Sequence, residues 1–404
     1  MHNQYMDEEL FTRVLSNSAQ MIEEHTTEKL RPASRDIIDA ISKSRGLSVI
    51  AGLRGTGKTT LLIELSVKNQ NSLYINAELL VKYDIDLLDF LQHAYSKGLS
   101  MFLLDEIHAI PDWEKDIKIF YDTTKAKIVA SGSSALAITT RASELSRRAS
   151  IYILKPLSFR EYLYFRTGQL LPKVTIDDIL TNKTELVKKV APHISLFEPY
   201  LSNDALPAAF FENKKDTYLG VLSRTIHYDL LALREIDVHY VESAFKIMKF
   251  IATAEPAEVS YSKLATSLGR STKFVIELAR LLNLSGIVMQ IPPQGQGHKA
   301  IRAEDKLLLP LSFRAALAGD YGTKPSIGGM REDFFAQHIG NCTYLRSRKA
   351  RKTPDFKCGN RIFEVGGPSK KKTQINKLKN AYLVTESIVP SKDEIPIYLL
   401  GLLY

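Results

Sequence analysis

The residues best suited to chemistry lie in a Gly-rich turn near the N-terminus. Gly52-Leu53-Arg54-Gly55-Thr56-Gly57-Lys58-Thr59 fits the pattern G-x-x-x-x-G-K-[ST]. In this pattern backbone N–H groups surround the phosphates, Lys58 reaches the β- and γ-phosphates, and the Thr59 hydroxyl binds Mg²⁺. We therefore predict a site for ATP and Mg²⁺; ATP is favoured over GTP because no guanine-specifying motif stands out. The expected nucleotide-binding residues are Gly52, Arg54, Gly55, Thr56, Gly57, Lys58, Thr59 and Thr60.

The elements around this turn suit a phosphate site. Leu47–Ala51 is a short apolar run rich in β-branched residues, which predicts a buried parallel strand. Thr59–Val67 has helical spacing of leucines, and a helix N-terminus attracts anions through its dipole and its unpaired N–H groups. The alternative is a chance Gly-rich turn, which the flanking strand and helix together disfavour.

A second pair of reactive residues follows another apolar run. Met101-Phe102-Leu103-Leu104 ends in Asp105 and Glu106. A central strand is apolar on both faces, and its C-terminal end points towards the phosphate loop. We predict that Asp105 holds the Mg²⁺ shell and that Glu106 polarises the attacking water. The alternative is a strand that ends in solvated acids.

Two further stretches could contact the γ-phosphate. Lys127–Ala130 predicts a strand that runs into Ser131-Gly132-Ser133-Ser134, where Ser131 or Ser133 is the candidate γ-phosphate sensor. A serine that caps a helix explains either residue equally well. Arg147 or Arg148 could stabilise the charge that develops in phosphoryl transfer, either in its own subunit or in a neighbouring one. A solvated basic helix end is the alternative.

The C-terminal part contains a possible second site. Phe356-Lys357-Cys358, the turn Gly359-Asn360 and Arg361-Ile362-Phe363 predict a hairpin, because a two-residue loop fixes the register. Counting outward places Asp355 opposite Glu364, and two opposed carboxylates are more stable around a divalent cation. We expect Glu332, at the start of a helix, to complete this metal site.

The preceding region has the order of a winged helix. Tyr261–Gly269 and Arg270–Leu284 predict two helices, and Ile287–Ile291 predicts a short strand. The exposed positions of the second helix are mixed in charge (Lys273, Glu277, Arg280). DNA contact through this helix and a purely packing role both stay open.

Several phrases identify a family resemblance. They are the phosphate loop followed by Thr60, the segment 105–114 (DEIHAIPDWE), the segment 131–134 (SGSS) and the segment 155–162 (KPLSFREY). With them the chain resembles prokaryotic ATPases of the AAA+ superfamily whose nucleotide domain is followed by a restriction-endonuclease-like C-terminal domain. The chain departs from relatives at 200–207 (YLSNDALP), where they usually have Gly-Gly.

This resemblance implies an α/β fold with four parts. They are a AAA+ P-loop domain with a parallel sheet and N-terminal helices (1–160), a helical lid (161–245), a winged helix (246–310) and a PD-(D/E)xK-like α/β domain (311–404). The lysine expected two residues after Glu364 is replaced by Gly366, and Lys370, Lys371 or Lys372 is the candidate substitute. Metal-assisted cleavage of DNA and an inactive nuclease fold kept for binding or assembly therefore both stay open.

Composition sets broad limits. The chain has 404 residues, enough for two or three domains, with 45% apolar and 25% charged residues. Its net charge of +9 suits nucleic acid or an inert basic surface. No apolar run approaches the roughly 20 residues that cross a bilayer, and the N-terminus has no secretory signal. Two cysteines, Cys342 and Cys358, cannot build a disulfide framework, so we expect a reducing cytoplasm.

Overall fold

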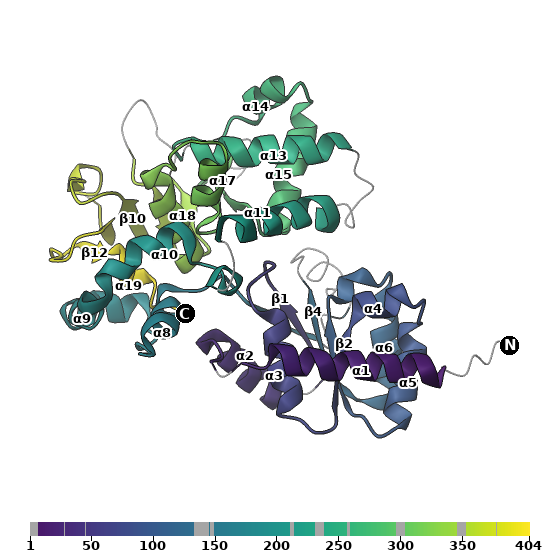
Figure 1. Cartoon of the computed structure of the whole chain (residues 1–404). Coiled ribbons are helices and arrows are strands. Elements are labelled where there is room, and N and C mark those ends of the chain that lie inside the picture. Colours follow the sequence, from purple (N-terminus) through teal and green to yellow (C-terminus); the bar gives the residue numbers. More distant parts are fainter. Residues whose placement is uncertain are drawn as a thin grey trace. The chain divides into compact units, whose positions relative to one another are not determined.

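The protein is described here by a computed structural model (Figure 1). The described residues are 7–27, 29–44, 46–132, 145, 149–210, 214–230, 238–256, 259–295, 304–345, 353–376 and 378–404. The chain divides into two compact units, Met1–Lys155 and Pro156–Tyr404. Each unit is considered by itself. Within the described residues, no helix is both long and apolar enough to span a membrane.

A parallel five-stranded sheet forms the centre of the first unit. Its order is β2-β3-β4-β1-β5, and every neighbouring pair is parallel. The strands are β1 (Leu47–Ala51), β2 (Ser72–Asn76), β3 (Met101–Asp105), β4 (Lys127–Gly132) and β5 (Ala149–Ile153). β1 and β3 are buried along their whole length, as expected for central strands with helices over both faces.

Helices cover both faces of this sheet (Figure 1). They are α1 (Glu8–His25), α2 (Pro32–Lys43), α3 (Lys58–Val67), α4 (Ala77–Lys82), α5 (Leu87–Ser96) and α6 (Trp113–Thr124). Alternate residues of β3 join different apolar clusters: Phe102 and Leu104 pack with α5 and α6, whereas Leu103 packs with α2 and α3. This is the two-residue period of a strand that is buried on both sides.

One predicted helix is divided in the structure. The sequence favours a single helix over Leu79–Tyr95, but α4 and α5 are separate. Asp84 takes a left-handed backbone with φ of 53°, and the Asp86 side chain accepts from the N–H of Asp89 at 2.9 Å. The prediction of one helix was wrong because these two aspartates end one helix and cap the next.

The second unit begins with helices. They are α8 (Phe159–Thr167), α9 (Ile176–Val190), α10 (Phe197–Asn203), α11 (Lys214–Arg224), α13 (Val238–Thr253), α14 (Tyr261–Leu268) and α15 (Thr272–Leu284). The antiparallel strands β6 (Met289–Ile291) and β7 (Lys306–Leu308) follow α15. This second unit also has the 3₁₀ segments Ala191–Leu196, Pro207–Phe210 and Lys372–Gln374, and a π-helical turn at Thr225–Asp229. The first unit has a 3₁₀ segment at Ile107–Ala109.

A mixed sheet lies in the last part of this unit. After α17 (Phe313–Asp320) and α18 (Ile327–Ile339) come β8 (Thr343–Tyr344), β9 (Phe356–Cys358), β10 (Arg361–Val365), β11 (Ala381–Thr385), β12 (Glu394–Pro396) and α19 (Ile397–Leu400). The sheet order is β12-β11-β10-β9-β8, with β8, β9 and β10 antiparallel and β10, β11 and β12 parallel. The predicted hairpin register is confirmed, since Cys358 pairs with Arg361 and Phe356 with Phe363.

The two ends of this unit meet in one apolar core, which contains residues of 157–205 and of 330–402. Ser158 caps α8 together with Glu161, and its hydroxyl also donates to the carbonyl of Tyr404 at 2.8 Å. The N–H of Arg160 donates to the carbonyl of Gly401 at 2.9 Å. The KPLSFREY phrase is therefore a helix start that also holds the C-terminal residues.

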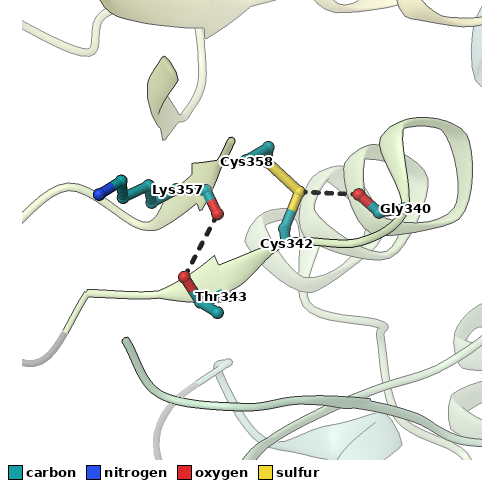
Figure 2. The surroundings of a disulfide bond; sticks show 5 residues. All are labelled: Gly340, Cys342, Thr343, Lys357 and Cys358. Atoms are coloured by element: carbon teal, nitrogen blue, oxygen red, sulfur yellow. Dashed lines mark hydrogen bonds between the residues drawn. A yellow bond between two sulfur atoms is a disulfide. The ribbon is translucent and has the colours of Figure 1, made fainter. Parts of the chain in front are cut away.

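The two cysteines form a disulfide (Figure 2). Cys342 and Cys358 lie 4.4 Å apart at their Cα atoms, beside the pairing of β8 with β9. The Thr343 hydroxyl donates to the carbonyl of Lys357 at 3.3 Å across the same strands. One disulfide does not make a disulfide framework, as expected from two cysteines. The expectation of a reducing compartment, however, loses its basis, because the two cysteines are bonded to each other here.

Candidate functional site

The phosphate loop joins β1 to α3. Glycine is required at two positions of this loop, for a different structural reason at each. Gly57 is the N-cap of α3 and has a φ of 93°, a conformation that L residues rarely adopt. A Cβ on Gly52 would collide with the carbonyl of Leu154, whose own N–H donates to Ala51 at 2.8 Å. The loop is thus pressed against the chain that follows β5, and only glycine fits at position 52.

Lys58 lies within the curve of the loop. Its ammonium donates to the carbonyls of Gly52 and Leu53, each at 3.0 Å, and the residue is buried. The Thr56 hydroxyl donates to the carbonyl of Leu53 at 2.8 Å, so the loop is also closed by its own side chain. From outside, Arg31 donates to the carbonyl of Thr56 at 2.7 Å. Sequence reasoning missed Arg31, which lies far from the motif and just before α2.

The carboxylate of Asp105 accepts hydrogen bonds from several hydroxyl groups. At the C-terminal end of β3 its Oδ2 accepts from the Thr59 hydroxyl at 2.7 Å and from the Tyr74 hydroxyl at 2.9 Å. Its Oδ1 accepts from the Ser131 hydroxyl. Burial, followed by the charge of Asp105, raises the pKa of Tyr74, so the phenol stays a donor. The structure therefore brings together the two predicted Mg²⁺ ligands, Thr59 and Asp105, whose oxygen atoms suit that ion.

At Glu106, directly after β3, the backbone leaves the extended conformation of the strand. Its backbone is left-handed, with a φ of 51°, a costly conformation that is concentrated at functional sites. One carboxylate oxygen lies 3.5 Å from Nη1 of Arg54, and the other lies 3.4 Å from Nδ1 of His108. The predicted base is thus next to the phosphate loop and in contact with it.

The remaining predicted residues of this site have different outcomes. Thr60 lies half-buried in the first turn of α3, and Gly55 has a φ of 77° within the loop. Ser131 is buried at the end of β4. Ser133, Arg147 and Arg148 lie outside the described residues. The roles of sensor and of arginine in phosphoryl transfer stay predictions.

Comparison with known proteins agrees with this geometry. Residues 44–163 match the model of a AAA domain. The uncharacterized protein MJ1637 of Methanocaldococcus jannaschii is 32% identical over 320 residues, which are 72% of this chain and 67% of that protein. The chain is a P-loop protein of AAA+ type and belongs to the family of MJ1637.

Other similarities are weaker. An uncharacterized protein of Haemophilus influenzae is 25% identical, and the match covers 55% of this AAA+ chain and 55% of that protein, so the chain spans about half of its length. The structure of DnaA from Aquifex aeolicus bound to AMPPCP has a TM-score of 0.26 at 13% identity, over 62% of this chain and 85% of that one. PCH-2 of C. elegans has a TM-score of 0.24 at 17% identity, over 54% and 63%.

In the second unit, the three predicted metal-binding acids lie on different elements. Glu332 is in the middle of α18 instead of at its start, because the helix begins at Ile327 after the Ser326 cap. Glu364 is on β10, and Asp355 precedes β9. The hairpin pairing ends at Phe356 and Phe363, and Asp355 accepts from the N–H of Val365 at 2.8 Å. Asp355 thus lies one step beyond the regular pairing that would put it directly opposite Glu364.

Two lysines reach this acidic cluster. Nζ of Lys370 lies 2.5 Å from Glu364, and Nζ of Lys306 pairs with Glu332. Lys370 is one of the three candidates that the sequence offered for the displaced lysine. Lys306, on β7, was not foreseen, because nothing in the sequence links that strand to α18.

Two carboxyl groups of this cluster, those of Glu332 and Glu364, hold their protons more tightly than usual. Burial and the nearby Asp355 raise the pKa of Glu364 to about 7, against the lowering effect of Lys370. Burial also raises the pKa of Glu332 to about 7, with Lys306 opposing it and Asp355 adding to it. Among the residues that the structure describes, no group of three His, Cys, Asp or Glu side chains is arranged to hold a metal ion. The metal site at Glu332, Asp355 and Glu364 stays a prediction.

The region expected to form a winged helix contains two helices and two antiparallel strands. Ser271 caps α15, and Lys273, Ile276 and Arg280 are exposed along it. Glu277, expected from the sequence to be exposed, is only partly exposed, so the charged residues exposed along α15 are the basic Lys273 and Arg280. The sequence has further basic residues in the stretch 346–352 (RSRKARK) and at Lys377, and these fall outside the described residues. Lys372 is described, and its Nζ lies 3.5 Å from Asp393.

Proposed function

We propose that the chain binds ATP with Mg²⁺ at the loop Gly52–Thr59 and hydrolyses it. The observation that carries this proposal is the 2.7 Å contact between Thr59 and Asp105, which joins the end of the phosphate loop to the acidic end of β3. A hydroxyl and a carboxylate held together at the N-terminus of a helix form the oxygen-rich surroundings that a Mg²⁺-bound triphosphate needs.

The residues divide the work. Lys58 exchanges its contacts with the loop carbonyls for phosphate oxygens, and its charge offsets the charge that accumulates on them. Thr59 and Asp105 would hold Mg²⁺, which would offset part of the negative charge of the phosphates. Glu106, beside the loop, orients that water and accepts its proton. Tyr74 and Ser131 fix the direction of the Asp105 carboxylate.

Hydrolysis can be tested by the release of inorganic phosphate with ATP and Mg²⁺. Glu106→Gln keeps the shape of the side chain but removes the base, so we expect phosphate release to fall by about 100-fold or more. Glu78→Gln, an exposed acid on α4, is the matched control and should leave the rate unchanged. A rate in Glu106→Gln equal to that of the wild type would contradict the assigned role.

We further propose that ATP turnover is coupled to DNA through the second unit. Support comes from the net charge of +9, from α14, α15, β6 and β7 in the order of a winged helix, and from acids with a lysine near β10. Arg147 or Arg148 would act from a neighbouring subunit of a homo-oligomer. DNA should then stimulate phosphate release.

A second candidate is a nucleotide-dependent switch or scaffold whose nuclease-like part only binds. It is favoured by the lysines paired with Glu332 and Glu364, which occupy the surroundings where a metal ion would be needed. Incubation of DNA with the protein, ATP and Mg²⁺ or Mn²⁺ separates the two. Cleavage that is lost in Asp355→Ala and Glu364→Ala supports the nuclease, whereas nucleotide-dependent assembly without cleavage under either metal supports the switch.

A further inference from the structure

Arg54 is a charged side chain built into the phosphate loop. It is the third residue of the motif, and its side chain is 15% exposed. Its guanidinium reaches the acid that follows β3, with Nη1 at 3.5 Å from Oε1 of Glu106. His108 lies 3.4 Å from the other oxygen of that carboxylate, whose side chain is 16% exposed. Glu106 is thus between two nitrogen-bearing side chains, one of which belongs to the loop.

The chemistry of this contact is that of a phosphate ligand. A guanidinium presents a planar set of N–H donors that fits a carboxylate or a phosphate equally well. Arg54 extends from a loop whose backbone surrounds phosphates, and it points to the residue expected to activate water at the terminal phosphate. A γ-phosphate bound at this loop would therefore compete with the Glu106 carboxylate for the same donor.

We propose that Arg54 is a γ-phosphate ligand supplied by the loop itself, and that it moves from Glu106 to the γ-phosphate when a triphosphate binds. The proposal rests on the proposed ATP site. The exchange makes the loop distinguish ATP from ADP, because only the triphosphate offers the competing anion. It also releases the Glu106 carboxylate from its contact with the Arg54 guanidinium.

Equilibrium binding of ADP and of a non-hydrolysable ATP analogue, each with Mg²⁺, tests this exchange. In Arg54→Ala we expect analogue affinity to fall by about tenfold or more, the loss produced by one hydrogen bond to a charged group, with ADP affinity nearly unchanged. Arg54→Lys keeps the charge without the planar donors, so its affinity for the analogue should lie between those of the wild type and Arg54→Ala. Glu106→Gln frees the guanidinium and should tighten analogue binding, and this gain should vanish in the double variant.

Arg13→Ala is the matched control, because Arg13 is an exposed arginine of the same unit paired with Glu9. Thermal melting of each variant reports whether the unit still folds. The proposal is overturned if Arg54→Ala and Arg54→Lys bind both nucleotides in the wild-type ratio, or if the effects of Arg54→Ala and Glu106→Gln simply add. Wild-type protein that binds neither nucleotide would contradict the ATP site itself, whereas wild-type ADP binding with an unchanged ratio contradicts only the role of Arg54.

Discussion

Asp105 shows how one carboxylate is held ready for a cation. Hydroxyl groups reach it from α3, β2 and β4, and each donates a hydrogen bond. Hydrogen bonds to a charged acceptor are stronger than neutral ones and fix the direction of the carboxylate. Thr59 was predicted from its motif, but Tyr74 was not, since a tyrosine in an apolar strand reads as a core residue.

Tyr74→Phe tests that positioning. Loss of one donor to Asp105 should raise the Mg²⁺ concentration needed for half-maximal nucleotide binding by about tenfold, because such a bond contributes about 1.5 kcal/mol or more. A Mg²⁺ titration of nucleotide binding measures it. Tyr95→Phe, which removes a more exposed hydroxyl of the same unit, should have no effect. Equal Mg²⁺ requirements in all three proteins would show that Tyr74 serves packing alone.

The acids of the second unit predict a pH dependence of stability. The pKa values of Glu332 and Glu364 are both raised from the ordinary value of 4.5 to about 7. Between pH 4.5 and pH 7 the folded chain therefore binds more protons than the unfolded chain. The free energy of unfolding must then fall as pH rises through that window.

Glu332→Gln and Glu364→Gln should reduce this fall. Melting temperatures at pH 5 and pH 8 measure it, and we expect each variant to lose at least about 3 °C less than the wild type, the shift that 1 kcal/mol gives in a unit of this size. Glu198→Gln, an exposed acid of the same unit, is the control. A wild-type pH dependence in both variants would refute the raised pKa values.

Among the elements, β8 is short, and the disulfide joins Cys342, the residue before it, to Cys358 in β9. The bond closes a loop with a sequence separation of 16, for which chain entropy alone contributes about 3 kcal/mol. Cys342→Ser with Cys358→Ser should lower the free energy of unfolding by that amount in oxidising buffer. With reductant the variant and the wild type should match. A difference that persists under reduction would assign the loss to packing.

Elements could be predicted where local signals agree. β1, α3, β3 and the hairpin of β9 and β10 follow from apolar runs, a Gly-rich turn and a two-residue loop, and the structure has them. The break between α4 and α5 was missed, because Asp84 and Asp86 can be helix residues as well as turn residues. The pairing of Lys306 with Glu332 was also missed, because it joins a strand and a helix that local pattern does not relate.

At the scale of the whole chain, long-range contacts decide what the sequence leaves open. The second unit is held together by Arg314, which pairs with Asp333 at 2.6 Å, and both side chains are 1% exposed. Arg314 also donates to carbonyls near the end of α13, those of Ile251, Ala252 and Ala254. Gly329 on α18 leaves room for its guanidinium. Neither residue forms a motif, so the sequence gives no sign of the pair.

Removal of one partner of this pair should be costly. Asp333→Ala leaves a buried guanidinium without its counter-charge, and we expect a loss of about 3–5 kcal/mol in the free energy of unfolding. Asp177→Ala breaks the exposed pair of Asp177 with Arg361 and should cost less than about 1 kcal/mol. Urea denaturation compares the two. Similar losses would show that burial does not set the contribution of Arg314.

The account as a whole depends on ATP at the phosphate loop, and calorimetric titration of the purified chain with ATP, with and without Mg²⁺, tests this most directly. We predict saturable binding that is tighter with Mg²⁺ and is lost in Lys58→Ala. Lys68→Ala, at the exposed end of the same helix, should bind as the wild type does. Absence of ATP binding by the wild type, or equal binding by Lys58→Ala, would contradict the account.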